Sequence, residues 1–223
     1  MTGKLFCQAI IKFITGILIV GVLLFLPAGT FAYRQAWLLL AVLFLPMFFS
    51  GIVMMLKDPE LLRKRLNANE KETEQKQVIA LSGIMFLAAF MIAGLNIRFG
   101  LLILPAWLSY TAAIIFLAAY VLYAEVLREN RYLSRTIEIQ EDQKVIDTGL
   151  YGIVRHPMYT ATLFLFLSMP LILGSVFSFL ILLLYIPITR KRIQNEEKVL
   201  EQGLKGYPEY EKKVKYRMIP YIW

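Results

Sequence analysis

The chain has 223 residues, of which 58% are hydrophobic, and a formal net charge of +8. Soluble globular domains are about 45–50% apolar, so this composition excludes an ordinary soluble domain and predicts one integral membrane domain. One cysteine and one histidine exclude an intrachain disulfide and are too few for a clustered zinc site, so we expect no bound metal.

Four uncharged apolar stretches are each long enough to cross a hydrocarbon core of about 30 Å as a helix. They cover residues 13–33, 35–56, 77–97 and 99–124. The first exceeds a typical signal-peptide core, so we interpret it as a retained signal anchor. The connections at Arg34 and Arg98 are very short, which predicts two antiparallel helical hairpins.

The charged residues gather in three polar segments. All acidic residues and most lysines and arginines lie in 57–77, 125–155 and 190–223. A basic excess in loops between apolar runs indicates contact with anionic lipid headgroups rather than with nucleic acid. The basic residues of 57–77 predict that this connection faces the cytoplasm. Its charges at helical spacing, such as Arg63 and Glu70, predict a solvated connecting helix.

The last apolar stretch covers residues 156–189. As one helix it would be about 50 Å long, which is too long for a single span. Pro170 and Gly174 interrupt it near the middle, and a single crossing would place the basic segment 190–223 outside, against the positive-inside rule. We therefore predict a short hairpin, and with it an all-α polytopic membrane protein of about six transmembrane helices with both termini cytoplasmic.

This topology divides the chain into an N-terminal four-helix membrane region, 1–124, and a region that carries chemistry, 125–223. The hairpin returns the chain, so the corner at Arg155–Tyr159 must lie near the helix that follows Arg190. His156 is expected at the N-cap of its helix with Pro157 in the first turn, where free backbone N–H groups can bind a carboxylate. The alternative is that His156 only caps the helix.

Arg192, Glu196 and Leu200 are spaced to share one face of the helix after Arg190. An ordinary surface ion pair is the alternative for the first two. Aromatic residues flank the same region, and interfacial belts explain most of them. The sequence leaves open which of them line a site: Tyr132, Tyr151, Tyr159, Tyr207, Tyr210, Tyr216 or Trp223.

Three motifs occur in a fixed order here. They are Gly-Leu-Tyr-Gly-Ile-Val-Arg-His-Pro-Met-Tyr at 149–159, Arg-Ile-Gln-Asn-Glu-Glu-Lys-Val-Leu at 192–200 and Gly-Tyr-Pro-Glu-Tyr at 206–210. The combination resembles the isoprenylcysteine carboxyl methyltransferase family and its phospholipid-methylating relatives, over roughly 125–223. The resemblance implies a membrane enzyme that uses S-adenosylmethionine. It also implies a cytoplasmic cofactor site built from the 125–157 loop and the C-terminal helix, and a lipophilic acceptor that enters from the bilayer.

The resemblance also implies roles for individual residues. Arg192 matches a family arginine associated with the substrate, and we expect Arg192 and Glu196 to be catalytic. The chain departs from the eukaryotic pattern at Thr136 (a glutamine there), at the Gln143-Lys144 pair (His-Thr) and at Asp147 (a small hydroxyl residue), although backbone contacts could survive. The implied cofactor-binding positions are Thr136, Gln143, Lys144, Val145, Ile146, Tyr151, His156, Pro157, Met158, Tyr159 and Glu196.

Methyl transfer from a sulfonium is a direct displacement, so the protein mainly supplies alignment and desolvation. A carboxylate acceptor, as in an isoprenylcysteine, needs no general base and could be held by Arg192. An amine acceptor would need a proton acceptor, for which Glu196, Glu197 and His156 are candidates. The alternatives are a phospholipid N-methyltransferase, an NADPH-dependent sterol-reductase-like enzyme and a non-catalytic membrane protein; the lack of charges within the apolar runs counts against a transporter.

Overall fold

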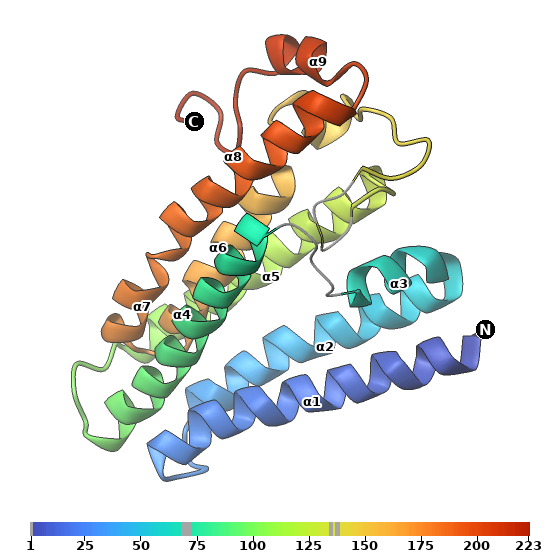
Figure 1. The fold of residues 1–223 in the computed structure, drawn as a ribbon. Helices are drawn as coiled ribbons and strands as arrows, with labels where there is room; N and C mark the ends of the chain where they lie inside the picture. The colour runs from blue at the N-terminus through green and yellow to red at the C-terminus, as the bar shows by residue number, and fades with distance from the viewer. Residues whose placement is uncertain (1, 68–72, 134–135, 137–138) are drawn as a thin grey trace.

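The structure is a computed structural model that describes residues 2–67, 73–133, 136 and 139–223 (Figure 1). Over these residues the regular structure is helical, which confirms the predicted all-α class. The elements in chain order are α1 (Thr2–Ala28), α2 (Arg34–Lys57), α3 (Pro59–Leu66), α4 (Thr73–Arg98), α5 (Ala106–Glu129), the 3-10 turn η1 (Gly149–Gly152), α6 (Pro157–Ile172), α7 (Val176–Leu182), α8 (Tyr185–Gly203) and α9 (Tyr207–Lys213).

The four long helices α1, α2, α4 and α5 are apolar enough to cross a membrane, and they confirm the four long helices expected from the sequence. Large apolar side chains such as Leu18, Leu56 and Ile114 are exposed on them. Lipid covers such surfaces favourably, and helices of this length satisfy their own backbone hydrogen bonds in lipid. The protein is therefore an integral membrane protein.

The predicted hairpin is present as a reverse turn between α6 and α7. The turn depends on Gly174, which adopts the left-handed conformation with φ of 71°, and on Ser175, whose hydroxyl accepts the Ser178 N–H at 3.2 Å. The return arm differs from expectation, because it is broken between α7 and α8 and α8 then continues past Arg190 without interruption. Pro187, in the first turn of α8, explains the break, since its missing N–H cannot continue α7.

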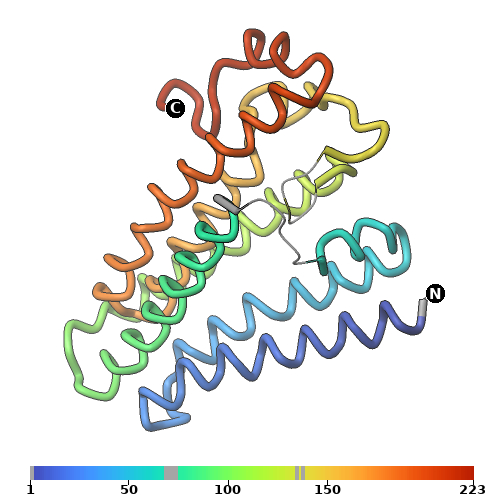
Figure 2. The backbone as a smooth tube through the Cα atoms, viewed as in Figure 1, coloured from blue at the N-terminus to red at the C-terminus, as the bar shows by residue number. Residues whose placement is uncertain are grey.

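Three turns are joined at the end of the molecule opposite η1 and α9 (Figure 2). The buried Tyr33, between α1 and α2, donates its hydroxyl hydrogen to the Leu173 carbonyl at 2.7 Å. The Leu104 N–H, between α4 and α5, donates to the Gly174 carbonyl at 2.9 Å. Both chain termini lie away from this end. The count of six crossings stays a prediction, since α6 has 16 residues and is about 24 Å long.

The apolar core lies between α1, α2, α4, α5 and the α6–α7 arm. Leu24, Leu39, Phe116 and Ile172 are fully buried in it. Helices α1 and α4 approach closely at Gly94, where a Cβ would lie 2.6 Å from the Leu24 carbonyl oxygen. This packing fixes the frame from which α6 and α8 extend toward the polar end.

The connecting helix expected in 57–77 is confirmed for one part of that segment, the short helix α3. The Asp58 carboxylate caps it by accepting the Leu61 N–H at 3.0 Å, and Pro59 occupies its first turn. Leu61 and Leu62 are buried, so α3 is solvated on one side only. Glu70, part of the charge pattern behind this prediction, lies outside the described residues.

Candidate functional site

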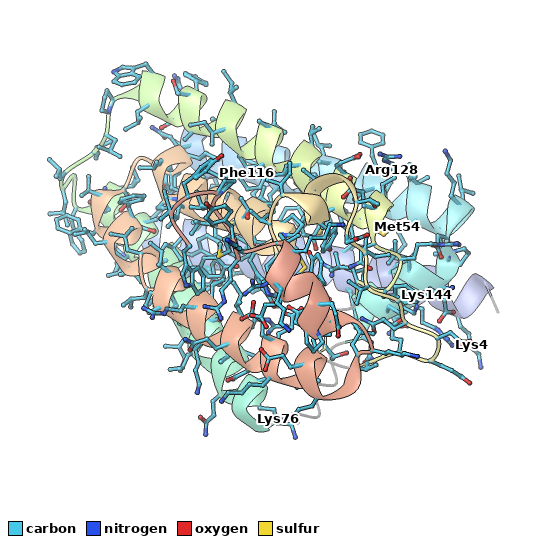
Figure 3. All side chains as sticks on the ribbon, turned by 90° about the horizontal axis from the view of Figure 1, so that it is seen from above. Lys4, Met54, Lys76, Phe116, Arg128 and Lys144 are labelled. Carbon is cyan, nitrogen blue, oxygen red and sulfur yellow. The ribbon has the colours of Figure 1, made fainter. Side chains whose placement is uncertain are left out.

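A pocket opens at the polar end of the molecule, beneath α9 and beside the loop that carries Lys144. Figure 3 views the molecule from this side. Eleven of the twelve residues singled out from the sequence line it, and Pro157 does not. Those that do are Thr136, Gln143, Lys144, Val145, Ile146, Tyr151, His156, Met158, Tyr159, Arg192 and Glu196. The α6–α8 hairpin thus brings together residues about forty positions apart in the sequence.

The corner Arg155–Tyr159 begins α6 as expected, with His156 at the N-cap and Pro157 in the first turn. The His156 side chain, however, accepts no capping hydrogen bond from the helix. The backbone N–H groups of Arg155 and His156 donate to the Tyr216 and Arg217 carbonyls at 2.9 and 2.8 Å. Residues 214–223, which we call the C-terminal tail, therefore lie against the corner.

Fewer backbone donors are free at this helix start than the sequence suggested. Pro157 has no N–H, and the Tyr159 N–H donates back to the His156 carbonyl at 3.0 Å. The Thr160 hydroxyl is also engaged, by the Met218 carbonyl of the tail at 2.7 Å. A carboxylate at this corner would depend on side chains more than on a row of free N–H groups.

Tyr159 connects Arg192 with Glu196. The Arg192 Nε–H donates to the Tyr159 hydroxyl oxygen at 2.9 Å, and that hydroxyl donates to Glu196 Oε2 at 2.6 Å. Tyr159 is buried and all three side chains line the pocket. Arg192 and Glu196 are therefore built into the pocket wall, and the expected alternative of an ordinary solvated pair does not describe them.

Glu197, the next residue, faces a separate buried cluster of charges. Its Oε1 accepts hydrogen bonds from Arg155 Nε and Nη2 at 2.9 and 2.8 Å and lies 3.1 Å from His156 Nε2. Its Oε2 accepts the Arg217 Nε–H at 2.7 Å. The side chains of this cluster are at most 7% exposed in the case of Arg155, His156 and Glu197.

The pKa of Glu197 reflects two opposing effects. Burial raises it, but the hydrogen bonds and charges of His156 and Arg155 outweigh burial and lower the pKa to about 2. Glu197 is thus ionised and fully engaged at neutral pH. Of the three candidate proton acceptors, Glu197 and His156 pair with each other, and Glu196 is the one whose carboxylate lines the pocket.

The loop side of the pocket is fixed around η1. Both oxygens of Glu129, at the end of α5, accept the Leu150 N–H at 3.0 and 3.2 Å. The Tyr151 hydroxyl accepts a hydrogen bond from Asn130 Nδ2 at 3.1 Å, and the Tyr151 carbonyl accepts the Tyr210 hydroxyl at 2.7 Å. Tyr151 is thereby held from α5 on one side and from α9 on the other.

The structure selects among the aromatic residues that flank the site. Five line the pocket: Tyr132, Tyr151, Tyr159, Tyr207 and Tyr210. Trp223 instead packs against the guanidinium groups of Arg217 and Arg190, at 5.5 and 6.0 Å from the ring centroid. The sequence reasoning missed Asn130, Leu133, Val199 and Leu204, which also line the pocket. Val199 lies seven residues, or about two helical turns, after Arg192, a spacing that could have revealed it.

Comparisons with known proteins give a family match and a similar solved structure. Residues 110–202 match the sequence model of the isoprenylcysteine carboxyl methyltransferase (ICMT) family. The fold is similar to the solved structure of the eukaryotic intramembrane Ras methyltransferase ICMT without a monobody, with a TM-score of 0.57 and 18% sequence identity. That likeness covers 92% of this chain and 74% of the other. Comparison with curated proteins gives no match.

The matched region begins inside α5 and includes the corner, the hairpin and most of α8. The pocket-lining residues therefore fall within it, except Leu204, Tyr207 and Tyr210. Over residues 110–202, the chain is similar to the isoprenylcysteine carboxyl methyltransferase family.

Proposed function

We propose that the protein is an integral-membrane methyltransferase that uses S-adenosylmethionine to methylate the carboxyl group of an isoprenylcysteine-like acceptor. The match to the family model supports the reaction class and a methyl donor. One observation carries the assignment of the site: the pocket that joins the corner to Arg192 and Glu196 of α8. We assign the chemistry to residues 125–223 and place the site at the cytoplasmic surface.

The residues of the pocket fit this cofactor. Tyrosine rings and the apolar side chains Val199, Leu200 and Leu204 offer walls for a nucleoside. The Glu196 carboxylate can accept hydrogen bonds from ribose hydroxyls or attract a positive group. His156 and Lys144 also line the pocket and can face a carboxylate. When bound, the cofactor would supply an electrophilic methyl group on a sulfonium.

Arg192 is the residue we assign to the acceptor. A guanidinium can hold a carboxylate with two parallel hydrogen bonds, and the contact with the Tyr159 hydroxyl orients it. A carboxylate is already ionised at neutral pH, so no base is needed. The pairing of Glu197 with Arg155, His156 and Arg217 leaves few bases for deprotonating an amine, which favours the carboxyl acceptor.

The placement of the pocket supports a lipophilic acceptor. Tyr159 and Arg192 lie where α6 and α8 leave the apolar hairpin for the polar end. A polar head held by Arg192 would therefore allow a hydrocarbon chain to stay in the bilayer.

Calorimetric titration of the purified protein with S-adenosylmethionine and, in parallel, with NADPH tests the cofactor. We expect saturable binding of S-adenosylmethionine and no binding of NADPH; the reverse result would favour the reductase alternative. Methyl transfer from labelled S-adenosylmethionine to a prenylcysteine analogue and to phosphatidylethanolamine then tests the acceptor. Transfer to the amine lipid alone would reject the carboxyl assignment.

A further inference from the structure

Tyr207 is a buried tyrosine of the pocket whose hydroxyl has no partner. Helix α9 begins at Tyr207, directly after Gly206, which takes a left-handed conformation with φ of 88°. The side chain is 4% exposed and lines the pocket. Its Oη makes no hydrogen bond to any residue that the structure describes. Buried tyrosine hydroxyls usually have a partner, so this one calls for a physical explanation.

The other four tyrosines of the pocket make the contrast clear. Tyr132 donates to the Asp142 carbonyl at 3.1 Å, and Tyr210 donates to the Tyr151 carbonyl. Tyr151 accepts from Asn130, and Tyr159 donates to Glu196. Within the described residues, Tyr207 is thus the pocket tyrosine whose hydroxyl makes no hydrogen bond.

The surroundings of the Tyr207 hydroxyl restrict what it can bind. Burial raises the pKa of Tyr207, and the negative charges of Glu197 and Glu196 raise it further. The phenol therefore stays protonated at neutral pH and can donate a hydrogen bond. The two carboxylates outweigh the opposing positive charge of Arg155, so an uncharged acceptor is favoured over a ligand carboxylate there.

We propose that Tyr207 is a further cofactor-binding residue, whose hydroxyl donates a hydrogen bond to an uncharged polar group in the nucleoside half of the ligand. This inference rests on the proposed function, because it takes the pocket to be the S-adenosylmethionine site. Candidate acceptors are a ribose hydroxyl and a ring nitrogen of the base. The unpaired hydroxyl is then explained as a group that the ligand satisfies.

The test is Tyr207→Phe, which removes only the hydroxyl. Loss of one hydrogen bond should weaken the binding of S-adenosylhomocysteine about 2- to 10-fold in calorimetry. Without ligand, the same change removes an unpaired buried group, so the thermal unfolding midpoint should rise by about 2–4 °C. A residue that only packs the pocket would not combine weaker binding with higher stability.

Tyr210→Phe is the matched control, since it loses the same atom from the same short helix. It leaves the Tyr151 carbonyl without its donor, so the unfolding midpoint of the ligand-free protein should fall. The nucleoside assignment is tested with S-adenosyl-3-thiopropylamine, which is S-adenosylhomocysteine without the carboxylate. Tyr207→Phe should weaken binding of both ligands by the same factor.

Three results would overturn the inference. Equal affinity of wild type and Tyr207→Phe for S-adenosylhomocysteine would remove Tyr207 from the binding site while leaving the proposed function intact. A penalty that disappears with the decarboxylated ligand would place the hydroxyl at the carboxylate instead. Failure of the wild-type protein to bind S-adenosylhomocysteine would reject the proposed function, and the inference with it.

Discussion

Glu197 holds together parts of the chain that are far apart in sequence. Its carboxylate accepts hydrogen bonds from Arg155 of the corner and from Arg217 of the C-terminal tail. Buried ion pairs add little to stability over apolar groups of the same shape, but removing one partner leaves the others unpaired. We therefore attribute to Glu197 the positioning of the corner rather than a role in methyl transfer.

Glu197→Gln should lower the free energy of unfolding at pH 7 by about 3–5 kcal/mol, measured by denaturant unfolding in detergent. The exposed Glu209→Gln on α9 is the control and should change it by less than about 0.5 kcal/mol. A loss from Glu197→Gln no larger than that of the control would contradict the buried cluster.

Lowering the pH should remove the stabilisation that Glu197 provides. The pKa of Glu197 in the folded protein, about 2, lies below the ordinary value of 4.5, so the unfolded chain takes up the proton first. The stabilisation is complete above about pH 4.5 and is lost as the pH falls toward 2, with a total of about 3 kcal/mol. Unfolding curves of wild type between pH 5 and 2 should show this slope, and those of Glu197→Gln should show less of it.

Arg192→Lys tests the acceptor assignment. Lysine keeps the charge but cannot make two parallel hydrogen bonds to a carboxylate. Turnover of a prenylcysteine analogue should fall about 10- to 100-fold, while S-adenosylmethionine affinity should stay close to that of wild type. Arg190→Lys, two residues earlier and exposed outside the pocket, should keep its turnover. A loss of cofactor affinity equal to the loss of turnover would move Arg192 to the cofactor side.

The turn η1 depends on a single glycine. Gly149 has φ of 54°, and a Cβ there would overlap the Glu129 carboxylate that holds the Leu150 N–H. Gly149→Ala should therefore destabilise the protein by about 2 kcal/mol or more and weaken cofactor binding through Tyr151. Gly100→Ala has the same backbone strain, with φ of 57°, but its Cβ would meet open space. It should cost about 1 kcal/mol, and equal effects at both positions would exclude the overlap.

Apolar length and turn residues predicted most of the helices. The four long helices follow from uncharged runs, and the α6–α7 turn follows from Gly174 within a stretch too long for one span. The break before α8 has a signal in Pro187, but a proline inside an apolar run is also compatible with a kinked continuous helix. Helix propensity could not decide between a break and a kink, since the packing of α7 and α8 against α4 and α6 also determines the shape of this segment.

The parts of the pocket that are formed by characteristic side chains could be predicted from the sequence, whereas the contacts made by backbone carbonyls could not. The corner, Arg192 and Glu196 stand out as residue types at a fixed spacing. The C-terminal tail contacts the corner through the carbonyls of Tyr216 and Arg217, and any residue has a carbonyl. Glu196 and Glu197 face different partners because neighbouring residues on a helix are rotated by about 100°. The sequence alone did not show which partner each carboxylate would face.

The three joined turns define one side of the molecule. Tyr33, Leu104 and Leu173–Ser175 meet there, whereas α3, η1 and α9 lie toward the other end (Figure 1). Together with the basic residues at 57–77 and 190–223, this arrangement supports a membrane topology in which the pocket end is cytoplasmic.

Reporter fusions placed after residue 70, after residue 140 and at Trp223 should all report the cytoplasmic side. A fusion after Gly100, in the connection between α4 and α5, should report the opposite side and serves as the internal control. A C-terminal reporter on the outside would contradict the return of the α6–α8 hairpin.

The contact between the tail and the corner has a consequence for biosynthesis. Arg155 and His156 leave the ribosome some sixty residues before the Val214–Arg217 segment that pairs with them. At about 5–20 residues per second, that interval lasts several seconds. During it Arg155 and His156 lack the carbonyls of residues 214–217 that they pair with in the folded protein, and the pocket lacks the Tyr207 and Tyr210 side chains of α9. The complete pocket therefore forms only after the tail has been synthesised.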